Sequence, residues 1–181
     1  MLKENKKKVL HISHTDIRTD SRILKELAAL SGTGLYKLSA IGVDSYDLSR
    51  EASIDSVDIV SIRLFFTRYK WRPSLLRYIL AYFELTLKLL YRGLRNSPAV
   101  VHCHDDMVLP VAWIISKARG AKLVYDAHEL ESEKNSQSRI NSTLTVLIEK
   151  IVWPSVDLLV TVSPSIKVWY KDKYGPKPAA L

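Results

Sequence analysis

Several features that would identify a class of protein are scarce in this sequence of 181 residues. It has a single cysteine, Cys103, which excludes an intramolecular disulfide and favours a reducing compartment. It has six glycines, and none of them forms a G-x-G-x-x-G pattern. That pattern opens the helix that binds the pyrophosphate of a dinucleotide. A nicotinamide or flavin enzyme is therefore disfavoured.

Long apolar runs are also missing. No stretch of about 18 uncharged apolar residues occurs, so we expect no transmembrane helix. The lysine-rich start is not followed by the apolar segment of a secretory signal, and we expect a cytoplasmic protein. Hydrophobic residues make up 47% and charged residues 25%, which is typical of a folded globular chain. The length suits one domain, expected to span residues 1–181.

Acidic residues are scarce in one segment. The net charge of the chain is +8, which favours an anionic partner such as nucleic acid, phospholipid or a phosphorylated small molecule. Within residues 68–95 the one acidic residue is Glu84. The seven basic residues of this segment are Arg68, Lys70, Arg72, Arg77, Lys88, Arg92 and Arg95.

Short apolar runs alternate with segments of helical periodicity. The runs, which we interpret as strands, cover residues 9–13, 37–43, 57–64, 99–102, 122–125 and 157–162. The expected helices cover residues 21–30, 73–94, 109–118, 138–153 and 164–174. Short apolar strands separated by helices predict an α/β domain, with a Rossmann-like parallel sheet and helices on both faces.

Ligands of such sheets bind outside the carboxyl ends of the strands. The loops at this edge are expected at residues 14–20, 104–107, 126–135 and 163–165. Polar and ionisable side chains are concentrated in these loops. The sequence therefore places the binding site at this edge of the sheet.

Two histidines close the fourth expected strand. His102 and His104 are two residues apart, so they would share one face of a continued strand. For His102 we favour a structural hydrogen bond to a loop carbonyl. For His104, expected at the mouth of the site, we favour a role as general base or as a ligand of a hydroxyl group. Zinc is an alternative that would also use Cys103 and His128, but no established ligand spacing is present and no metal is expected.

Two other loops contain charged residues with open roles. Glu129 either binds a sugar hydroxyl or is a solvated loop carboxylate. In the first loop, Arg18 and Arg22 would reach an anion near the helix N-terminus. Alternatively, Arg22 pairs with Asp16 or Asp20 and shapes the loop.

The basic segment has an apolar stripe at helical spacing. A basic helix with interleaved aromatic residues suits an anionic membrane surface. In the alternative, the stripe packs on the sheet and the charges are solvated. Both can hold, because the basic face stays free when the stripe packs. Nucleic-acid binding is disfavoured, because no recognised motif accompanies the charge. The stripe consists of Leu75, Leu76, Ile79, Leu80, Phe83, Leu87, Leu90 and Leu94, and the expected membrane-surface residues are Arg68, Lys70, Trp71, Arg72 and Arg77.

Four segments together resemble the N-terminal domain of GT-B glycosyltransferases of family 4. They occur in the order of the family and cover nearly the whole chain. The segments are the first strand with Thr15-Asp16 and Thr19-Asp20-Ser21-Arg22, the strand end Val100-Val101-His102-Cys103-His104-Asp105, the stretch of residues 122–130 that ends in Asp126-Ala127-His128-Glu129-Leu130, and residues 157–165 with Tyr174-Gly175 behind them.

The resemblance implies a retaining transferase that moves a sugar from a nucleotide-sugar to a glycan or lipid-linked acceptor, in cell-surface polysaccharide or glycolipid synthesis. It implies no cofactor. His104 would lie at the reaction centre. We expect the C-terminal donor-binding domain to be absent from this chain and the isolated chain to be inactive. The acceptor would contact Asp105, His128 and Glu129, and the donor phosphates would face Asp16, Arg18, Arg22, Ser163 and Ser165.

Two alternatives stay open. The chain would be a non-catalytic subunit that binds the acceptor or a membrane in a split glycosyltransferase. Or it would be half of a GT-B epimerase that acts on nucleotide-sugars. Contact with the inner face of a membrane is compatible with the first alternative and with the transferase.

Overall fold

The protein forms an eight-stranded sheet in a computed structural model that describes residues 6–45, 51–54, 56–68, 74–127 and 139–181. The order across the sheet is β3-β4-β2-β1-β5-β6-β7-β8, and each pair of neighbours is parallel except β3 and β4. The strands are β1 (Lys7–Ser13), β2 (Tyr36–Val43), β3 (Glu51–Ile54), β4 (Val57–Ile62), β5 (Val100–His104), β6 (Lys122–Asp126), β7 (Leu158–Val160) and β8 (Ala179–Ala180).

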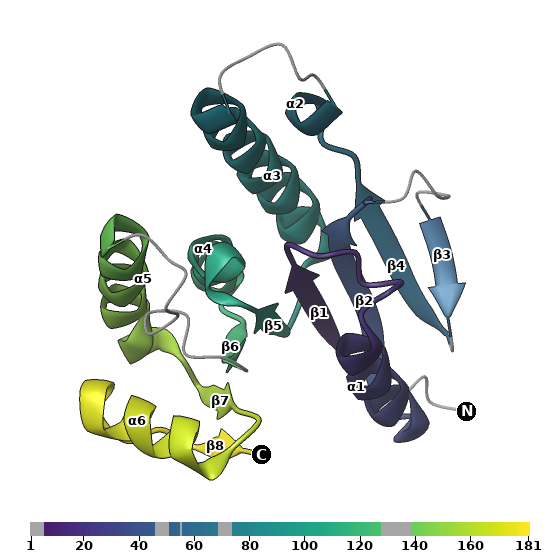
Figure 1. Cartoon of the computed structure of the whole chain (residues 1–181). Helices are drawn as coiled ribbons and strands as arrows, with labels where there is room; N and C mark the ends of the chain where they lie inside the picture. Colours follow the sequence, from purple (N-terminus) through teal and green to yellow (C-terminus); the bar gives the residue numbers. More distant parts are fainter. Residues whose placement is uncertain (1–5, 46–50, 55, 69–73, 128–138) are drawn as a thin grey trace.

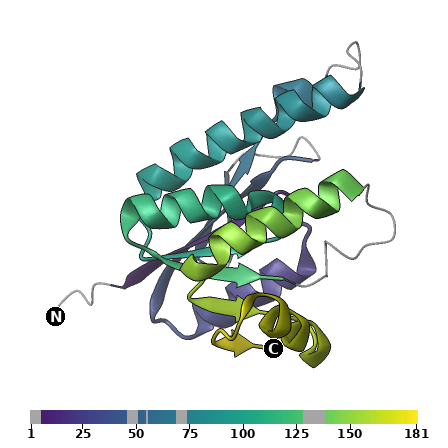
Figure 2. The ribbon, with the colours of Figure 1, turned by 90° about the vertical axis from the view of Figure 1, so that its left-hand side faces the viewer.

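Helices cover both faces of this sheet (Figure 1). Three of them, α3, α4 and α5, lie side by side on one face, and α1 lies on the other (Figures 1 and 2). The predicted Rossmann-like architecture is therefore confirmed. The helices are α1 (Ser21–Gly32), α2 (Phe65–Arg68), α3 (Ser74–Asn96), α4 (Leu109–Arg119), α5 (Arg139–Val152) and α6 (Pro164–Tyr174), with 3-10 turns η1 (Asp106–Val108) and η3 (Trp153–Ser155).

The ends of the helices follow from local sequence. The Asp20 carboxylate accepts hydrogen bonds from the backbone amides of Arg22 and Ile23, which satisfies two free donors at the start of α1. The Ser163 hydroxyl caps α6 in the same way, and Gly120 ends α4 with a φ of 63°. These caps fix where each helix begins beside the carboxyl end of a strand.

Two buried clusters form the core, one on each face of the sheet. The larger includes Leu10 and Ile12 of β1 and packs under α3, α4 and α5. The smaller includes Val9 of β1 with Ile23 and Leu27 of α1. Because side chains alternate along a strand, His11 and Ser13 point to the α1 face with Val9. Polar side chains thus interrupt the apolar layer under α1, at the carboxyl end of β1.

A glutamate is buried among tyrosines between α5 and α6. The carboxylate of Glu149 accepts hydrogen bonds from the hydroxyls of Tyr125 at 2.9 Å, Tyr170 at 2.5 Å and Tyr174 at 2.9 Å. Burial raises the pKa of Glu149, and the tyrosine hydrogen bonds oppose this shift. The cluster joins β6 to two helices and so holds the far end of the sheet together.

The sequence did not predict three short elements, namely β3, α2 and β8. Strand β3 has four residues and pairs antiparallel with β4, so it adds an antiparallel edge to an otherwise parallel sheet. Strand β8 has two residues, too few for a recognisable apolar run. Among the helices of the described residues, none is long and apolar enough to cross a membrane.

Most of the apolar stripe predicted for the long helix faces solvent and not the core. The side chains of α3 that are buried against the core are Ala81, Leu85 and Leu89. Leu75 and Phe83, which were assigned to the packed stripe, are 71% and 60% exposed. Of the predicted stripe, Leu90 and Leu94 do pack against the core, so the interpretation in which the stripe packs on the sheet holds only for the last turns of the helix.

Candidate functional site

Strands β1 and β5 lie side by side at the point where the order of strands reverses. From β1 the chain proceeds to β2 and β4 on one side, and from β5 it proceeds to β6, β7 and β8 on the other. Such a topological switch point is where open α/β sheets bind ligands. In the register of this pair, His11 lies opposite His102 and Ser13 lies opposite His104.

Three histidine rings stack on the α1 face of these two strands. The ring centroids of His102 and His104 are 4.3 Å apart, and those of His11 and His102 are 4.6 Å apart. Nδ1 of His11 and Nε2 of His104 are hydrogen-bonded at 3.0 Å. Glu26 of α1 approaches from above, with Oε2 at 3.8 Å from Nε2 of His102 and at 4.0 Å from Nδ1 of His104.

The network continues through Asp126 at the end of β6. Nδ1 of His104 lies 3.1 Å from Oδ2 of Asp126, and the same carboxylate oxygen lies 3.8 Å from Nε of Arg22. The Arg22 side chain is 28% exposed, whereas that of Asp126 is 2% exposed. A chain of contacts therefore runs from His11 inside the sheet to a guanidinium that reaches solvent at the start of α1.

The position predicted for His104 needs correction. The ring is completely buried, and both of its nitrogens have hydrogen-bond partners, so it lies beneath the mouth of the site and not at it. The structural role favoured for His102 differs in detail too, because its nearest polar partner is the Glu26 carboxylate and not a loop carbonyl. In this arrangement Asp126 links His104 to the partly exposed side chain of Arg22.

Burial controls the charge of the cluster. It lowers the pKa of His11 and of His102 well below the usual value, and the neighbouring His104 lowers both further. Both rings are therefore neutral at pH 7, with a nitrogen lone pair available. Burial also raises the pKa of Glu26. Each of these side chains is held in an environment that disfavours its charged form.

Asp105 holds a strained backbone conformation directly after β5. Its φ is 80° and its ψ is 156°, a region that residues other than glycine rarely adopt. Its carboxylate lies 3.1 Å from Nδ1 of His14, and its backbone amide donates to the carbonyl of Asp126. Such strain costs about 1–3 kcal/mol and tends to occur at functional sites. The predicted acceptor residue is thus held between the loops that follow β1 and β6.

The first loop contains a buried ion-pair network. The Arg18 guanidinium donates to both carboxylate oxygens of Asp16, at 2.8 Å and 2.7 Å, and to Asp44 at 2.7 Å. Burial alone would raise the pKa of Asp16, but these bonds and the backbone amide of Ser45 lower it. Asp16 and Arg18 therefore shape the loop. Neither of the two ion pairs considered for Arg22 forms, because its guanidinium lies nearest Asp126.

The first loop also packs closely on β2. A side chain at Gly42 would place its Cβ 2.5 Å from the carbonyl oxygen of Thr15 and 2.9 Å from Ile17. The backbone amide of Val43 donates to the same carbonyl. Glycine is needed here because the loop and the strand touch through their backbones. This contact holds the first loop against β2.

The other predicted residues are placed only in part. Ser163 and Ser165 lie at the start of α6, with their hydroxyl oxygens 2.9 Å apart. Arg77 lies on α3 with its guanidinium 5.4 Å from the Tyr78 ring, and Arg68 ends α2. The predicted residues that lie outside the described part of the chain are Lys70, Trp71, Arg72, His128 and Glu129.

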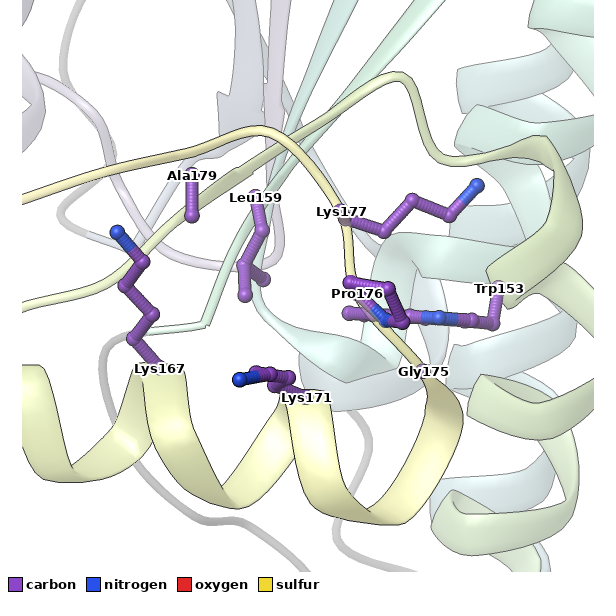
Figure 3. Close-up of a pocket in the computed structure, with 8 residues that line it drawn as sticks. All are labelled: Trp153, Leu159, Lys167, Lys171, Gly175, Pro176, Lys177 and Ala179. Carbon is purple, nitrogen blue, oxygen red and sulfur yellow. The ribbon is translucent and has the colours of Figure 1, made fainter.

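A small pocket lies away from this network, between α6 and the strands β7 and β8 (Figure 3). About 270 Å³ of empty space lies at this pocket, and part of it is open solvent. Its lining contains no histidine and no carboxylate, and consists of Trp153, Leu159, Lys167, Lys171, Gly175, Pro176, Lys177 and Ala179. We do not place the acceptor site here, because the histidines and carboxylates converge at the switch point instead.

Sequence reasoning missed two members of the cluster, His11 and Glu26. His11 lies within an apolar run that reads as an ordinary buried strand. Glu26 reads as a solvated position of an amphipathic helix. The alternation of His11 and Ser13 along β1 was the available signal, but the register with β5 was needed to use it.

Comparisons with known proteins agree with this geometry. Residues 22–180 match the family described as glycosyl transferase 4-like domain. Sucrose-phosphate synthase from Thermosynechococcus elongatus superposes with a TM-score of 0.72 at 11% identity, over 97% of this chain and 47% of that chain. A fragment of the same enzyme superposes with a TM-score of 0.67 at 8% identity, over 96% of this chain and 86% of the fragment. No curated protein sequence matches the chain.

A further solved structure is that of Anabaena HepE in complex with UDP-glucose. It superposes with a TM-score of 0.59 at 12% identity, over 96% of this chain and 42% of that chain. The chain thus spans about half the length of complete structures that share its fold. At these identities the superpositions establish the fold, which is that of one half of a GT-B protein.

Proposed function

Because the chain belongs to the family of glycosyl transferase 4-like domains, we propose that it is the acceptor-side half of a retaining glycosyltransferase. The whole enzyme would move a sugar from a nucleotide-sugar donor to a glycan or lipid-linked acceptor in cell-surface polysaccharide or glycolipid synthesis. The observation that carries the proposal is the network of His104, Asp126 and Arg22 at the switch point of the sheet. This is where a domain of this fold binds its ligand.

Each member of the network has a distinct role in the proposal. Arg22 is partly exposed and faces the phosphates of the donor or a hydroxyl of the acceptor. Asp126 orients the Arg22 guanidinium, and His104 orients Asp126. His104 is thus a positioning residue of the reaction centre. Asp105, with His14 beside it, and the segment with His128 and Glu129 would contact the acceptor.

The donor would be held chiefly by a second domain, as the resemblance to GT-B enzymes implies. Transfer would then need both halves, because the reacting sugar lies between them. With neutral histidines and paired carboxylates, this half would contribute to the reaction by orienting the reacting groups and by electrostatic stabilisation. We therefore expect that residues 1–181 bind the acceptor without turning it over.

The first prediction concerns the isolated chain. Purified residues 1–181 should bind a polyprenyl-linked glycan, measured by calorimetry, and should release no nucleotide from a panel of nucleotide-sugars. The Arg22→Gln variant should bind it more weakly, and Lys37→Gln, an exposed substitution on β2, should match the wild type. Sustained sugar transfer by the isolated chain would contradict the division into two halves.

A membrane surface is favoured by the exposed face of α3. The first half of this helix extends beyond the sheet (Figures 1 and 2), and large apolar side chains on it face solvent. An exposed apolar patch of this kind marks an interaction site, and its basic flanks suit anionic lipid. The exposed residues are Leu75, Leu76, Tyr78, Ile79, Tyr82, Phe83, Leu87 and Tyr91.

The second prediction concerns the contribution of the basic residues to vesicle binding at this surface. Replacing Lys70, Arg72 and Arg77 by glutamine should weaken binding to phosphatidylserine vesicles about 100-fold, since each basic residue contributes about 1 kcal/mol near such a surface. Co-sedimentation measures this affinity. The triple control Lys25→Gln, Lys37→Gln and Lys117→Gln lies on α1, β2 and α4 and should leave binding unchanged. Equal binding by both triple variants would rule out electrostatic docking through α3.

A further inference from the structure

The histidine cluster at the switch point has polar atoms that its hydrogen bonds do not use. His11, Glu26, His102 and His104 each offer one ligand atom, and these four atoms all lie within 4.8 Å of one another. They come from three elements, β1, α1 and β5, which meet only in the folded chain. Nitrogen and carboxylate oxygen are the ligands of zinc sites in proteins.

Buried polar atoms without hydrogen bonds point to a missing ligand. Nε2 of His102 and Oε2 of Glu26 are buried and have no hydrogen-bond partner among the described residues. The His11 side chain is completely buried, and His102 is 8% exposed. An unsatisfied buried polar group costs about 1–3 kcal/mol, so two that face each other are unusual in a native protein.

The distances fit a tetrahedral ion. Two ligand atoms of a zinc ion with bonds of about 2.0 Å are separated by roughly 3.3 Å. Nδ1 of His11 and Nε2 of His104 are 3.0 Å apart, and Nε2 of His102 and Oε2 of Glu26 are 3.8 Å apart. These two separations lie on either side of the expected value, and all four ligand atoms lie within 4.8 Å of one another.

Charge and the surrounding contacts fit as well. Asp126 accepts from Nδ1 of His104, which is the carboxylate–histidine arrangement that orients metal-binding histidines. The carboxylates of Glu26 and Asp126 both lie within 4.0 Å of Nδ1 of His104. A divalent cation bound by the rings would interact favourably with both carboxylates.

We propose that His11, Glu26, His102 and His104 bind one structural Zn²⁺ that ties α1 to β1 and β5. Four protein ligands close the coordination shell, which is the arrangement of structural zinc sites. The ion enters past Glu26, whose side chain is 27% exposed. This proposal departs from the expectation of no metal, and it replaces the zinc alternative that included Cys103. That thiol is buried in the core cluster of the opposite face.

The test uses purified residues 1–181 stripped with a chelator and then supplied with zinc sulfate. Plasma mass spectrometry after gel filtration should find one zinc per chain, and the melting temperature should rise. X-ray absorption at the zinc edge should show nitrogen and oxygen at about 2.0–2.1 Å and no sulfur near 2.3 Å. Failure of the wild-type chain to retain zinc would overturn the proposal, as would sulfur in the coordination shell.

Variants locate the site. Glu26→Gln and His102→Gln should each lower zinc affinity more than about 100-fold in a competition with a chromophoric chelator, and Asp126→Asn about 10–100-fold. The matched control is His14→Gln with His128→Gln, which replaces the two histidines outside the cluster and should keep full affinity. Loss of zinc in this control with retention in Glu26→Gln would place the ion elsewhere and refute the proposal. None of these readouts depends on sugar transfer.

Discussion

Replacing His104 by alanine in the complete glycosyltransferase is expected to lower kcat/KM for sugar transfer about 100-fold. The reason is positional, because Nδ1 of the ring lies 3.1 Å from Oδ2 of Asp126, and Asp126 in turn forms a longer ion pair with Arg22, at 3.8 Å from Nε. A displacement of about 1 Å at a reacting group can cost 10²-fold in rate. The loss should appear mainly in kcat, since a misplaced Arg22 weakens contacts in the transition state more than binding of the ground state.

A conservative variant separates positioning from folding. His104→Gln keeps a side-chain donor for Asp126 and should recover part of the lost kcat. Cys103→Ala is the matched control, because Cys103 is equally buried on the same strand but faces the opposite core cluster. It should lower the melting temperature and leave kcat unchanged. If folded His104→Ala transferred sugar with the kinetics of the wild type, the network would not belong to the reaction centre.

Replacing Glu149 by alanine is expected to lower the free energy of unfolding by at least about 3 kcal/mol. Three tyrosine hydroxyls donate to this carboxylate, and two of them, those of Tyr125 and Tyr170, are buried. Each buried hydroxyl left without an acceptor costs about 1–3 kcal/mol. For a domain of this size the melting temperature should fall by about 6–12 °C, since 1 kcal/mol shifts it by about 2–4 °C.

Two further variants bracket that effect. Glu149→Gln keeps one acceptor oxygen in the same place and should lose less than half as much stability. Asp172→Ala removes an exposed carboxylate of α6 and should change stability by less than about 0.5 kcal/mol. Calorimetric unfolding measures all three. A melting temperature of Glu149→Ala within 2 °C of the wild type would show that the tyrosine cluster does not stabilise the sheet.

The order of strands and helices was predictable because it rests on local signals. Apolar runs such as that of residues 9–13 and caps such as Asp20 and Ser163 depend on a few neighbouring residues. The parallel sheet then follows from the alternation of strand and helix. The two-residue strand β8 could not be found in this way, because its pairing with β7 is fixed by tertiary contacts.

The site was predictable as an edge of the sheet but not as a set of contacts. The described residues at the ends of β1, β5 and β6 do meet, whereas most of the loop predicted at residues 126–135 lies outside the described part of the chain. Which partners they take depends on register and on helix rotation. Register places His11 beside His102, and the rotation of α1 turns Glu26 inward. Neither quantity can be derived from composition or spacing.

The face of α3 that packs on the core could not be predicted from the sequence either. Its two apolar stripes are both compatible with helical periodicity, and the sequence favoured the one with the larger side chains. The structure buries the stripe of small and medium side chains, Ala81, Leu85 and Leu89, together with Gly93. Gly93 allows close approach, because a Cβ there would lie 2.4 Å from Cδ1 of Ile115 on α4. Helix packing therefore decides which stripe is left for a partner.

The most direct test of the proposed function is the product formed by the complete protein. Residues 1–181 joined to a donor-binding half should transfer the sugar of a nucleotide-sugar to a polyprenyl-linked glycan. Nuclear magnetic resonance of the product should show the same anomeric configuration as the donor. Isomerisation of the nucleotide-sugar without an acceptor would contradict the account and identify an epimerase, and an inverted anomer would contradict the retaining mechanism.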